Sequence, residues 1–233
     1  METQVVGQDG AVELFKSTDY DPFIKRSEQG SRLLARLISR VDLPETVILP
    51  TDRPAIIAAN HSSLFDLPAA LITLGHYGMR ARIGVNERFF SNPIAGRFLR
   101  NLGCIPFSRD SKERAEQTMV DALLAGELAA MMPEGKIVRR VDQLNGVGQG
   151  RPGISRVARR AGAVVVPVGF AMSDRAWPPG SPLPKVSFGR QRITTRIGPP
   201  IEFTTDDHEA NADKVMATIS ALVLQGRQVA LES

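Results

Sequence analysis

His61 is the one histidine that directly follows a predicted buried strand, a position where catalytic residues are often found. The chain has three histidines, and His61 follows directly on a short apolar run, residues 54–59, that predicts a buried strand. In open α/β folds, ligands and reactions gather at the carboxyl ends of strands. Asp66 follows His61 closely, and its carboxylate can hydrogen-bond one imidazole nitrogen and fix the tautomer. The other nitrogen is then free to accept a proton from a hydroxyl.

The spacing of this pair restricts its geometry. In an ideal helix, side chains five positions apart point about 140° away from each other, so His61 must lie in the turn before a helix. Pro68 favours that layout, because proline is tolerated in a helix's first turn and disfavoured deeper. A helix beginning near Asp66 would give the base-and-orienter logic of a serine protease triad, with a substrate hydroxyl replacing the serine. Two other interpretations stay open, with His61 as a structural residue and Asp66 as a helix N-cap.

Two further segments carry residues suited to binding. Residues 132–136, Met-Pro-Glu-Gly-Lys, follow a second apolar run, and residues 103–109 end a short predicted strand on Arg109. A guanidinium group donates two parallel hydrogen bonds to a phosphate, which makes arginine well suited to that ligand. Taken alone, the first segment is equally a tight turn, and Arg109 is equally a solvated surface charge.

The elements around these residues alternate between strand and helix. Residues 21–41 have the apolar spacing of an amphipathic helix, and the first ten residues have the composition of a loose tail. The patterns beyond them predict strands at 54–59, 81–85, 105–107, 163–168 and 185–197, and helices at 68–74, 93–102, 111–125, 152–161 and 210–224. This order is typical of an α/β fold with a single mostly parallel sheet flanked by helices. We therefore expect an N-terminal tail and amphipathic helical appendage over residues 1–45 and an α/β domain over residues 46–233.

Composition narrows the classes of function. Hydrophobic residues make up 42% of the 233 residues, enough for a core, and the formal net charge of +4 suits an anionic membrane surface or a phosphate-bearing substrate. The basic residues are dispersed, which disfavours a nucleic-acid binder. There is one cysteine, Cys104, so no internal disulfide is possible. The polar start of the chain and the lack of a long apolar run predict a cytoplasmic protein.

The segments together, in their order, resemble the four sequence blocks of the glycerolipid acyltransferase family, which includes bacterial 1-acylglycerol-3-phosphate acyltransferases. Residues 60–66, Asn-His-Ser-Ser-Leu-Phe-Asp, resemble the first block, a histidine and an aspartate separated by four residues. Residues 103–109 resemble the second block, residues 132–135 the third and residues 164–168 the fourth. The similarity covers residues 54–170, about half of the chain.

The resemblance implies a function and a role for each matching residue. A fatty acyl group would pass from acyl-CoA or acyl-carrier protein to the hydroxyl of a lysolipid, with 1-acylglycerol-3-phosphate as the first acceptor to test. His61 would be the general base and Asp66 its orienting partner. Arg109 would hold the acceptor phosphate, with Glu134, Gly135 and Lys136 in the acceptor site. The family needs no metal and no cofactor besides the acyl donor.

One departure from the family pattern concerns the acceptor. The third block usually continues with a small residue and an arginine, whereas this chain has Lys136 and Ile137, followed by Arg139 and Arg140. The phosphate contact would then move to Lys136 or to the two arginines, or the acceptor would be a lyso-ornithine lipid, a glycolipid or another alcohol. With water as the acceptor, the protein would be a thioesterase, and without turnover a non-catalytic acyl- or lipid-binding protein.

Lipid acceptors lie in bilayers, so we expect peripheral association with the inner face of the cell membrane. A basic amphipathic helix can lie in the headgroup region, and residues 21–41 have that pattern. The alternative is that their apolar face packs on the α/β domain. The aromatic segments at 89–90 and 177–180 are further candidates for lipid contact, or for packing.

Overall fold

The computed structural model describes residues 3–6, 22–50, 52–188 and 191–232. Its strands are β1 Thr3–Val6, β2 Arg40–Asp42, β3 Val47–Pro50, β4 Ala55–Ala59, β5 Ala81–Asn86, β6 Ile105–Phe107, β7 Leu128–Met131, β8 Val164–Ala171 and β9 Arg192–Ile197. Its helices are α1 Pro22–Ile38, α2 Asp66–His76, α3 Pro93–Asn101, α4 Lys112–Leu124, α5 Gly153–Ala161, α6 Ser173–Ala176 and α7 His208–Leu231, with short 3₁₀ helices η2 Glu87–Phe90 and η3 Arg140–Asp142.

Seven strands form one sheet in the order β2-β9-β8-β4-β7-β5-β6, and β1 pairs with β3 in a separate antiparallel ribbon. The strands from β8 to β6 are all parallel, while β9 runs antiparallel to β8 and carries β2 at the edge. The β-branched run that forms β8 is buried at every position, as a central strand covered on both faces should be. The predicted α/β fold with one mostly parallel sheet is confirmed.

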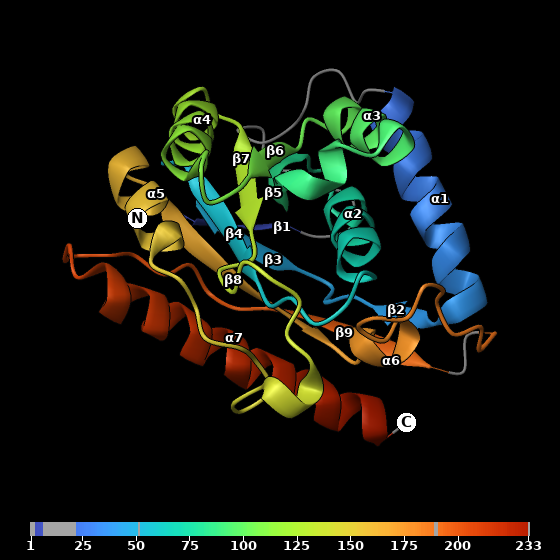
Figure 1. The fold of residues 1–233 in the computed structure, drawn as a ribbon. Coiled ribbons are helices and arrows are strands. Elements are labelled where there is room, and N and C mark those ends of the chain that lie inside the picture. Colours follow the sequence, from blue (N-terminus) through green and yellow to red (C-terminus); the bar gives the residue numbers. More distant parts are fainter. Residues whose placement is uncertain (1–2, 7–21, 51, 189–190, 233) are drawn as a thin grey trace.

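Helices cover both faces of the sheet (Figure 1). Helices α1, α2 and α3 lie on one side, and α4, α5 and α7 lie on the other. Successive β8 residues alternate between the two layers: Val165 packs with α4, α5 and α7, whereas Val164 and Val166 pack in the α1–α3 layer. The parallel strands therefore end at one edge of a rigid three-layer core, and this edge carries the chemistry-bearing residues.

The N-terminal part is more closely joined to the sheet than the sequence predicts. The amphipathic helix ends at Ile38 rather than at residue 41, because the amide of Arg40 donates to the carbonyl of Gln191 at 2.7 Å and begins β2. The sheet thus starts ahead of the expected boundary at residue 45. The expected tail also contains an element, since residues 3–6 form β1.

The predicted strand at 185–197 is wrong at residues 185–188, which form no strand, and β9 begins at Arg192. Residues 189–190 of this prediction lie outside the described residues. The amides of Ser187 and Phe188 donate instead to the carbonyl of Leu37, at 3.3 and 2.9 Å. Tertiary contact with the end of α1 overrides the alternating pattern of this segment. None of the helices in the described ranges is long and apolar enough to cross a membrane.

Helix α7 approaches the sheet so closely that glycine is required at the contact. A Cβ added at Gly226 would lie 2.5 Å from Thr194 Oγ1 and 2.9 Å from the Cβ of Ala171. Thr194 Oγ1 also donates to the carbonyl of Gly226 at 2.8 Å. The packing of α7 on β8 and β9 therefore depends on the missing side chain.

We expect Gly226→Ala to lower the free energy of unfolding by about 1 to 3 kcal/mol, because the added methyl group overpacks this contact. The matched control is Gly30→Ala in α1, where a Cβ would meet no atom within 4 Å. That change should raise stability by up to about 1 kcal/mol through helix propensity. Urea denaturation of both variants tests the prediction, and equal effects would contradict it.

Candidate active site

His61 and Asp66 meet at the carboxyl end of β4. His61 follows β4 in a turn, and α2 begins at Asp66, as the spacing predicts. The Nδ1 atom of His61 lies 2.9 Å from Asp66 Oδ2. A carboxylate only accepts hydrogen bonds, so this contact puts a proton on Nδ1, and in the neutral imidazole Nε2 then keeps its lone pair. The imidazole is 23% exposed while the carboxylate is fully buried. The imidazole can therefore reach a substrate at the surface, while the carboxylate that orients it is shielded from solvent.

The turn between these two residues is folded around the carboxylate. Asp66 Oδ2 also accepts the backbone amides of Ser62 and Ser63, both at 2.8 Å. Asp66 bonds to amides that precede the helix and not to those of its first turn, and Phe65 is the N-cap residue of α2. The N-cap interpretation of Asp66 is therefore wrong. Its carboxylate instead fixes both the shape of the turn and the orientation of the imidazole.

Side chains that the sequence analysis left without a role hold this turn in place. Asn60 bonds to the backbone of Phe170 in both directions, at 3.0 and 2.7 Å, and so ties β4 to β8. Ser62 Oγ lies 2.9 Å from Ser173 Oγ, and Ser63 Oγ donates to the carbonyl of Trp177 at 2.7 Å. Asn60 precedes His61 in the first block, and this position is the one feature of the sequence that could have indicated its supporting role. The contacts that these side chains make with β8 and α6 could be identified only from the folded structure.

Glu134 lies behind His61 rather than in open space. It is 2% exposed, and its two carboxylate oxygens accept the amides of His61 and of Gly148, the latter at 2.6 Å. The amide of Val138 donates to the carbonyl of His61 at 2.8 Å. The segment that follows β7 therefore hydrogen-bonds both the amide and the carbonyl of His61. Burial raises the pKa of Glu134 to about 7, and the two amide hydrogen bonds oppose that rise.

Some of the cationic residues near the site are paired with acidic side chains and others are not. Arg140 forms two hydrogen bonds with Asp174, at 2.9 and 3.1 Å, and Arg139 pairs with Asp142 at 2.9 Å. These pairs disfavour the two arginines as phosphate ligands.

Lys136 and Arg109 are exposed and form no ion pair with the described residues. Arg109 follows β6, which β7 and β5 separate from β4. Three strand spacings put the end of β6 roughly 14 Å from the end of β4.

Arg151 is a cation that sequence analysis missed. Gly135 has a left-handed backbone, with φ of +66°, and a Cβ added there would lie 3.3 Å from the guanidinium carbon of Arg151. The amide of Arg151 donates to the carbonyl of Pro133 at 2.9 Å. Its guanidinium group therefore lies against Gly135 in the Pro-Glu-Gly turn. Sixteen positions separate Gly135 from Arg151 in sequence, so no local motif could reveal this contact.

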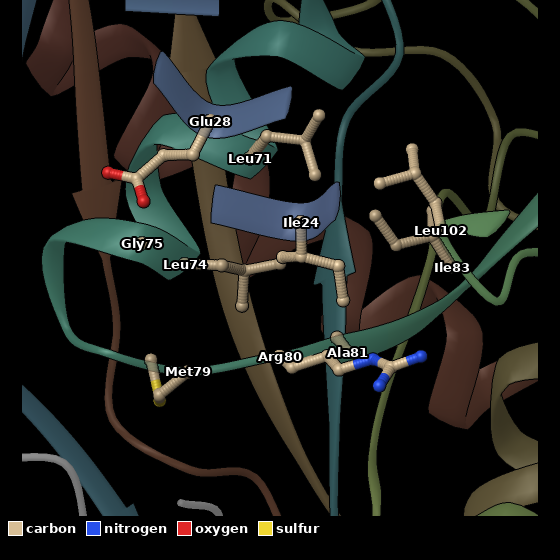
Figure 2. A pocket seen from close by; sticks show the side chains of 10 residues that line it. All are labelled: Ile24, Glu28, Leu71, Leu74, Gly75, Met79, Arg80, Ala81, Ile83 and Leu102. Atoms are coloured by element: carbon tan, nitrogen blue, oxygen red, sulfur yellow. The ribbon is translucent and has the colours of Figure 1, made fainter. Parts of the chain in front are cut away.

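An apolar pocket lies at the other end of α2 (Figure 2). Leu71 and Leu74 of α2 line it with Ile24 of α1, Ile83 of β5 and Leu102, and the pocket is small and partly open to solvent. Ten residues of helix separate His76 from Asp66, a length of roughly 15 Å. The pocket is therefore separate from the polar site. The described residues contain no group of three His, Cys, Asp or Glu that could hold a metal ion.

The buried carboxyl of Glu134 makes stability depend on pH. Its pKa in the fold is raised from 4.5 to about 7, so the folded state binds more protons than the unfolded state between these values. We expect the free energy of unfolding to fall as pH rises from 4.5 to 7, by on the order of 3 kcal/mol from this group. Urea denaturation of wild type and Glu134→Gln at several pH values measures the difference in slope. Parallel pH dependences would contradict the prediction.

Comparisons with known proteins address the family and the fold of the chain. Residues 40–171 match the family model described as Acyltransferase, which is more than half of the 233-residue chain. The fold is similar to that of the 1-acyl-sn-glycerophosphate (LPA) acyltransferase PlsC from Thermotoga maritima, with a TM-score of 0.65 and 21% sequence identity. The similarity covers 87% of this chain and 78% of that one. No significant match is found among curated proteins.

The matched region runs from β2 to the end of β8 and contains all four blocks of the predicted resemblance, which is thereby confirmed. The chain belongs to the Acyltransferase family.

Proposed function

We propose that this protein transfers a fatty acyl group from a thioester donor, acyl-CoA or acyl-carrier protein, to the hydroxyl of a lysolipid, with 1-acylglycerol-3-phosphate as the leading acceptor. The observation that carries the proposal is the His61–Asp66 pair, in which a buried carboxylate orients a partly exposed imidazole. Membership of the Acyltransferase family supports the same reaction class.

The nearby serines and the cysteine of the described chain are not available as nucleophiles for His61 to activate. Ser62 and Ser63 use their hydroxyls in bonds to Ser173 and to the carbonyl of Trp177. Cys104 is buried, which raises the pKa of its thiol to about 12 and keeps it protonated at neutral pH. These observations support the hydroxyl of the acceptor itself as the group that His61 activates.

The proposed step needs one proton transfer in each direction. His61 Nε2 takes the proton of the acceptor hydroxyl as its oxygen attacks the thioester carbonyl carbon. The tetrahedral intermediate collapses by breaking the carbon–sulfur bond, and the departing thiolate takes the proton back from the imidazolium. Asp66 stabilises that imidazolium, and Glu134 holds the His61 peptide in position. In this scheme no resident metal or cofactor takes part.

Unpaired cations are the basis for assigning the acceptor site. In the proposed complex, Arg109 and Lys136 bind the acceptor phosphate beside Gly135, and Arg151 supplies the guanidinium group that is missing from the third block. Because Arg139 and Arg140 are already paired with acids, they do not take part. The acceptor lies in a bilayer, so we propose that the protein works at the inner face of the cell membrane.

We expect His61→Ala to lower turnover by about 10² to 10⁴ fold, the usual cost of removing a general base. Asp66→Asn should lose a similar factor, because an amide opposite Nδ1 favours the wrong tautomer. The matched control is His76→Ala at the far end of α2, which should keep wild-type turnover. Release of free thiol from acyl-CoA measures each rate. Near-normal turnover in Asp66→Asn would refute its orienting role.

Arg109→Ala and Arg151→Ala should each raise the KM for a phosphate-bearing acceptor by about 10 to 100 fold, because each removes a charge-assisted hydrogen bond. The KM for acyl-CoA should stay unchanged. Arg139→Ala, which removes an arginine already paired with Asp142, serves as the control. Equal changes in the KM of both substrates would remove the phosphate assignment.

The acceptor itself is tested with a panel of lysophosphatidic acid, a lyso-aminolipid, a neutral alcohol and no acceptor. Thiol release that requires lysophosphatidic acid and is lost in His61→Ala would support the proposal. Release that requires another acceptor would keep the mechanism and change the substrate, as Lys136 and Ile137 in the third block suggest. Release without any acceptor would indicate a thioesterase. A silent panel with acyl-CoA would be repeated with an acyl-carrier-protein donor before the proposal is abandoned.

A further inference from the structure

Three arginine side chains lie near one carboxylate beside the His61 turn. Arg140 donates two hydrogen bonds to Asp174, at 2.9 and 3.1 Å. Arg175 is the next residue of α6, and Arg227 of α7 lies near enough for the charges of Arg140 and Arg175 to act on it. Guanidinium groups stay protonated at neutral pH. These four side chains, which we call the arginine cluster, therefore carry more positive than negative charge.

Arg227 is the member of the cluster whose charge is least compensated. Its Nη2 atom donates only to neutral oxygens, Oε1 of Gln143 at 2.7 Å and the carbonyl of Gly146 at 3.5 Å. Its Nε atom is buried and has no hydrogen-bond partner among the described residues. Burial lowers the pKa of Arg227, and of its charged neighbours the two other arginines lower it further while the carboxylate opposes them. A half-buried cation without an acid costs free energy, which a bound anion would offset.

Two charges of the cluster are available to an anion. Arg140 is held by Asp174, whereas Arg175 and Arg227 form no ion pair with any residue in the described ranges. Arg175 is also exposed, so an anion can reach it from solvent. The fork of a guanidinium group matches the oxygens of a phosphate. Phosphate is therefore the anion that these two side chains suit best.

Arg175 lies close to the catalytic pair along the chain. Ser173 Oγ is 2.9 Å from the Oγ of Ser62, and Ser62 directly follows His61. Arg175 follows Ser173 by two residues, so their Cα atoms are at most roughly 8 Å apart. An anion bound by Arg175 would therefore lie beside the base without occupying its position.

Arg227 is held at the same edge of the sheet. A Cβ added to Gly226, the preceding residue, would lie 2.9 Å from the Cβ of Ala171, the last residue of β8. The sheet order places β8 on one side of β4 and β7, β5 and β6 on the other. In Figure 1, α6 and the C-terminal half of α7 accordingly lie away from β6, the strand that leads to Arg109. The arginine cluster and Arg109 therefore flank the His61 turn from opposite sides.

We propose that Arg175 and Arg227 bind the phosphate at the end of the pantetheine arm that carries the acyl group of the donor. This inference rests on the proposed function and adds a donor site to it, opposite the acceptor site. A pantetheine arm separates the thioester from the phosphate, so the donor phosphate needs a site beside the base and not at it. Acyl-CoA and acyl-carrier protein share this phosphate, and the experiment below distinguishes the two sources.

Isothermal titration calorimetry with coenzyme A and with pantetheine, which lacks the phosphates, tests the site without any turnover. Wild type should bind coenzyme A at least about tenfold more tightly than pantetheine, because charge-assisted hydrogen bonds hold the phosphates. The double variant Arg175→Gln, Arg227→Gln should lose this preference. The control Arg160→Gln changes an exposed arginine in the last turn of α5 and should keep it.

The same titration with the holo and apo forms of an acyl-carrier protein tests the second source, because only the holo form has the arm. A preference for coenzyme A that the double variant loses assigns the site to the phosphates of acyl-CoA. A preference for the holo carrier protein that the double variant loses assigns it to the phosphodiester of that protein. The proposal is overturned if wild type shows neither preference, or if the double variant keeps the preference that wild type shows.

Arg227→Lys separates the charge of this residue from its packing. Lysine keeps the positive charge but cannot reproduce the hydrogen bonds of the guanidinium group to Gln143 and Gly146. The variant should retain most of the preference for the phosphate-bearing ligand, whereas Arg227→Gln should lose a large part of it. Equal losses in both variants, accompanied by equal losses of thermal stability, would indicate a structural role and contradict the assignment of Arg227.

Transfer assays separate the donor site from the proposed function. The double variant should raise the KM for the acyl donor by about 10 to 100 fold and leave the KM for the acceptor unchanged, the reverse of Arg109→Ala. Unchanged donor KM in an active double variant would refute the donor site and leave the proposed function intact. Conversely, a protein that binds coenzyme A through these arginines but transfers no acyl group to any acceptor would refute the function and leave the site.

Discussion

The site depends on a single buried oxygen atom. Asp66 Oδ2 accepts hydrogen bonds from the imidazole of His61 and from the amides of Ser62 and Ser63, all within 2.9 Å. A buried carboxylate is costly unless it is paired or hydrogen-bonded, so the turn must close around it for the domain to be stable. The same closure sets the angle of the imidazole. The same hydrogen bonds therefore stabilise the turn and orient the His61 imidazole, so a change in the turn also changes the orientation of the base.

Segments that follow the neighbouring strands also hydrogen-bond to the His61 turn and hold it in position. The segment after β7 holds the His61 peptide through Glu134 and Val138, and the segment after β8 holds the serines through Ser173 and Trp177. Asn60 ties β4 to β8 just below. A parallel sheet brings these segments to one edge, because all five of its parallel strands end there. The site is thus supported by rigid elements, with each support reaching it from a different strand.

The sequence predicted the central elements and the His61–Asp66 contact because both depend on local spacing and apolar periodicity. The start of α2 at Asp66 followed from Pro68, and the buried β8 followed from its β-branched run. The failures have a non-local cause. The packing of residues 187–188 on Leu37, the start of β2 at Arg40 and the position of Arg151 over Gly135 all depend on partners distant in sequence. Glu134 was expected among acceptor ligands, yet its hydrogen bonds are to backbone amides, and only the fold could reveal them.

The single cysteine of the chain has a practical consequence. Cys104 is buried beside α3 at the start of β6, and its thiol has a pKa of about 12. Reagents that report free thiols react with thiolates, so the folded protein contributes almost no background to an assay of released coenzyme A. The same property makes Cys104 a reporter of local opening. Slow labelling by such a reagent would measure how often the edge of the sheet near β6 separates from α3, without any engineered probe.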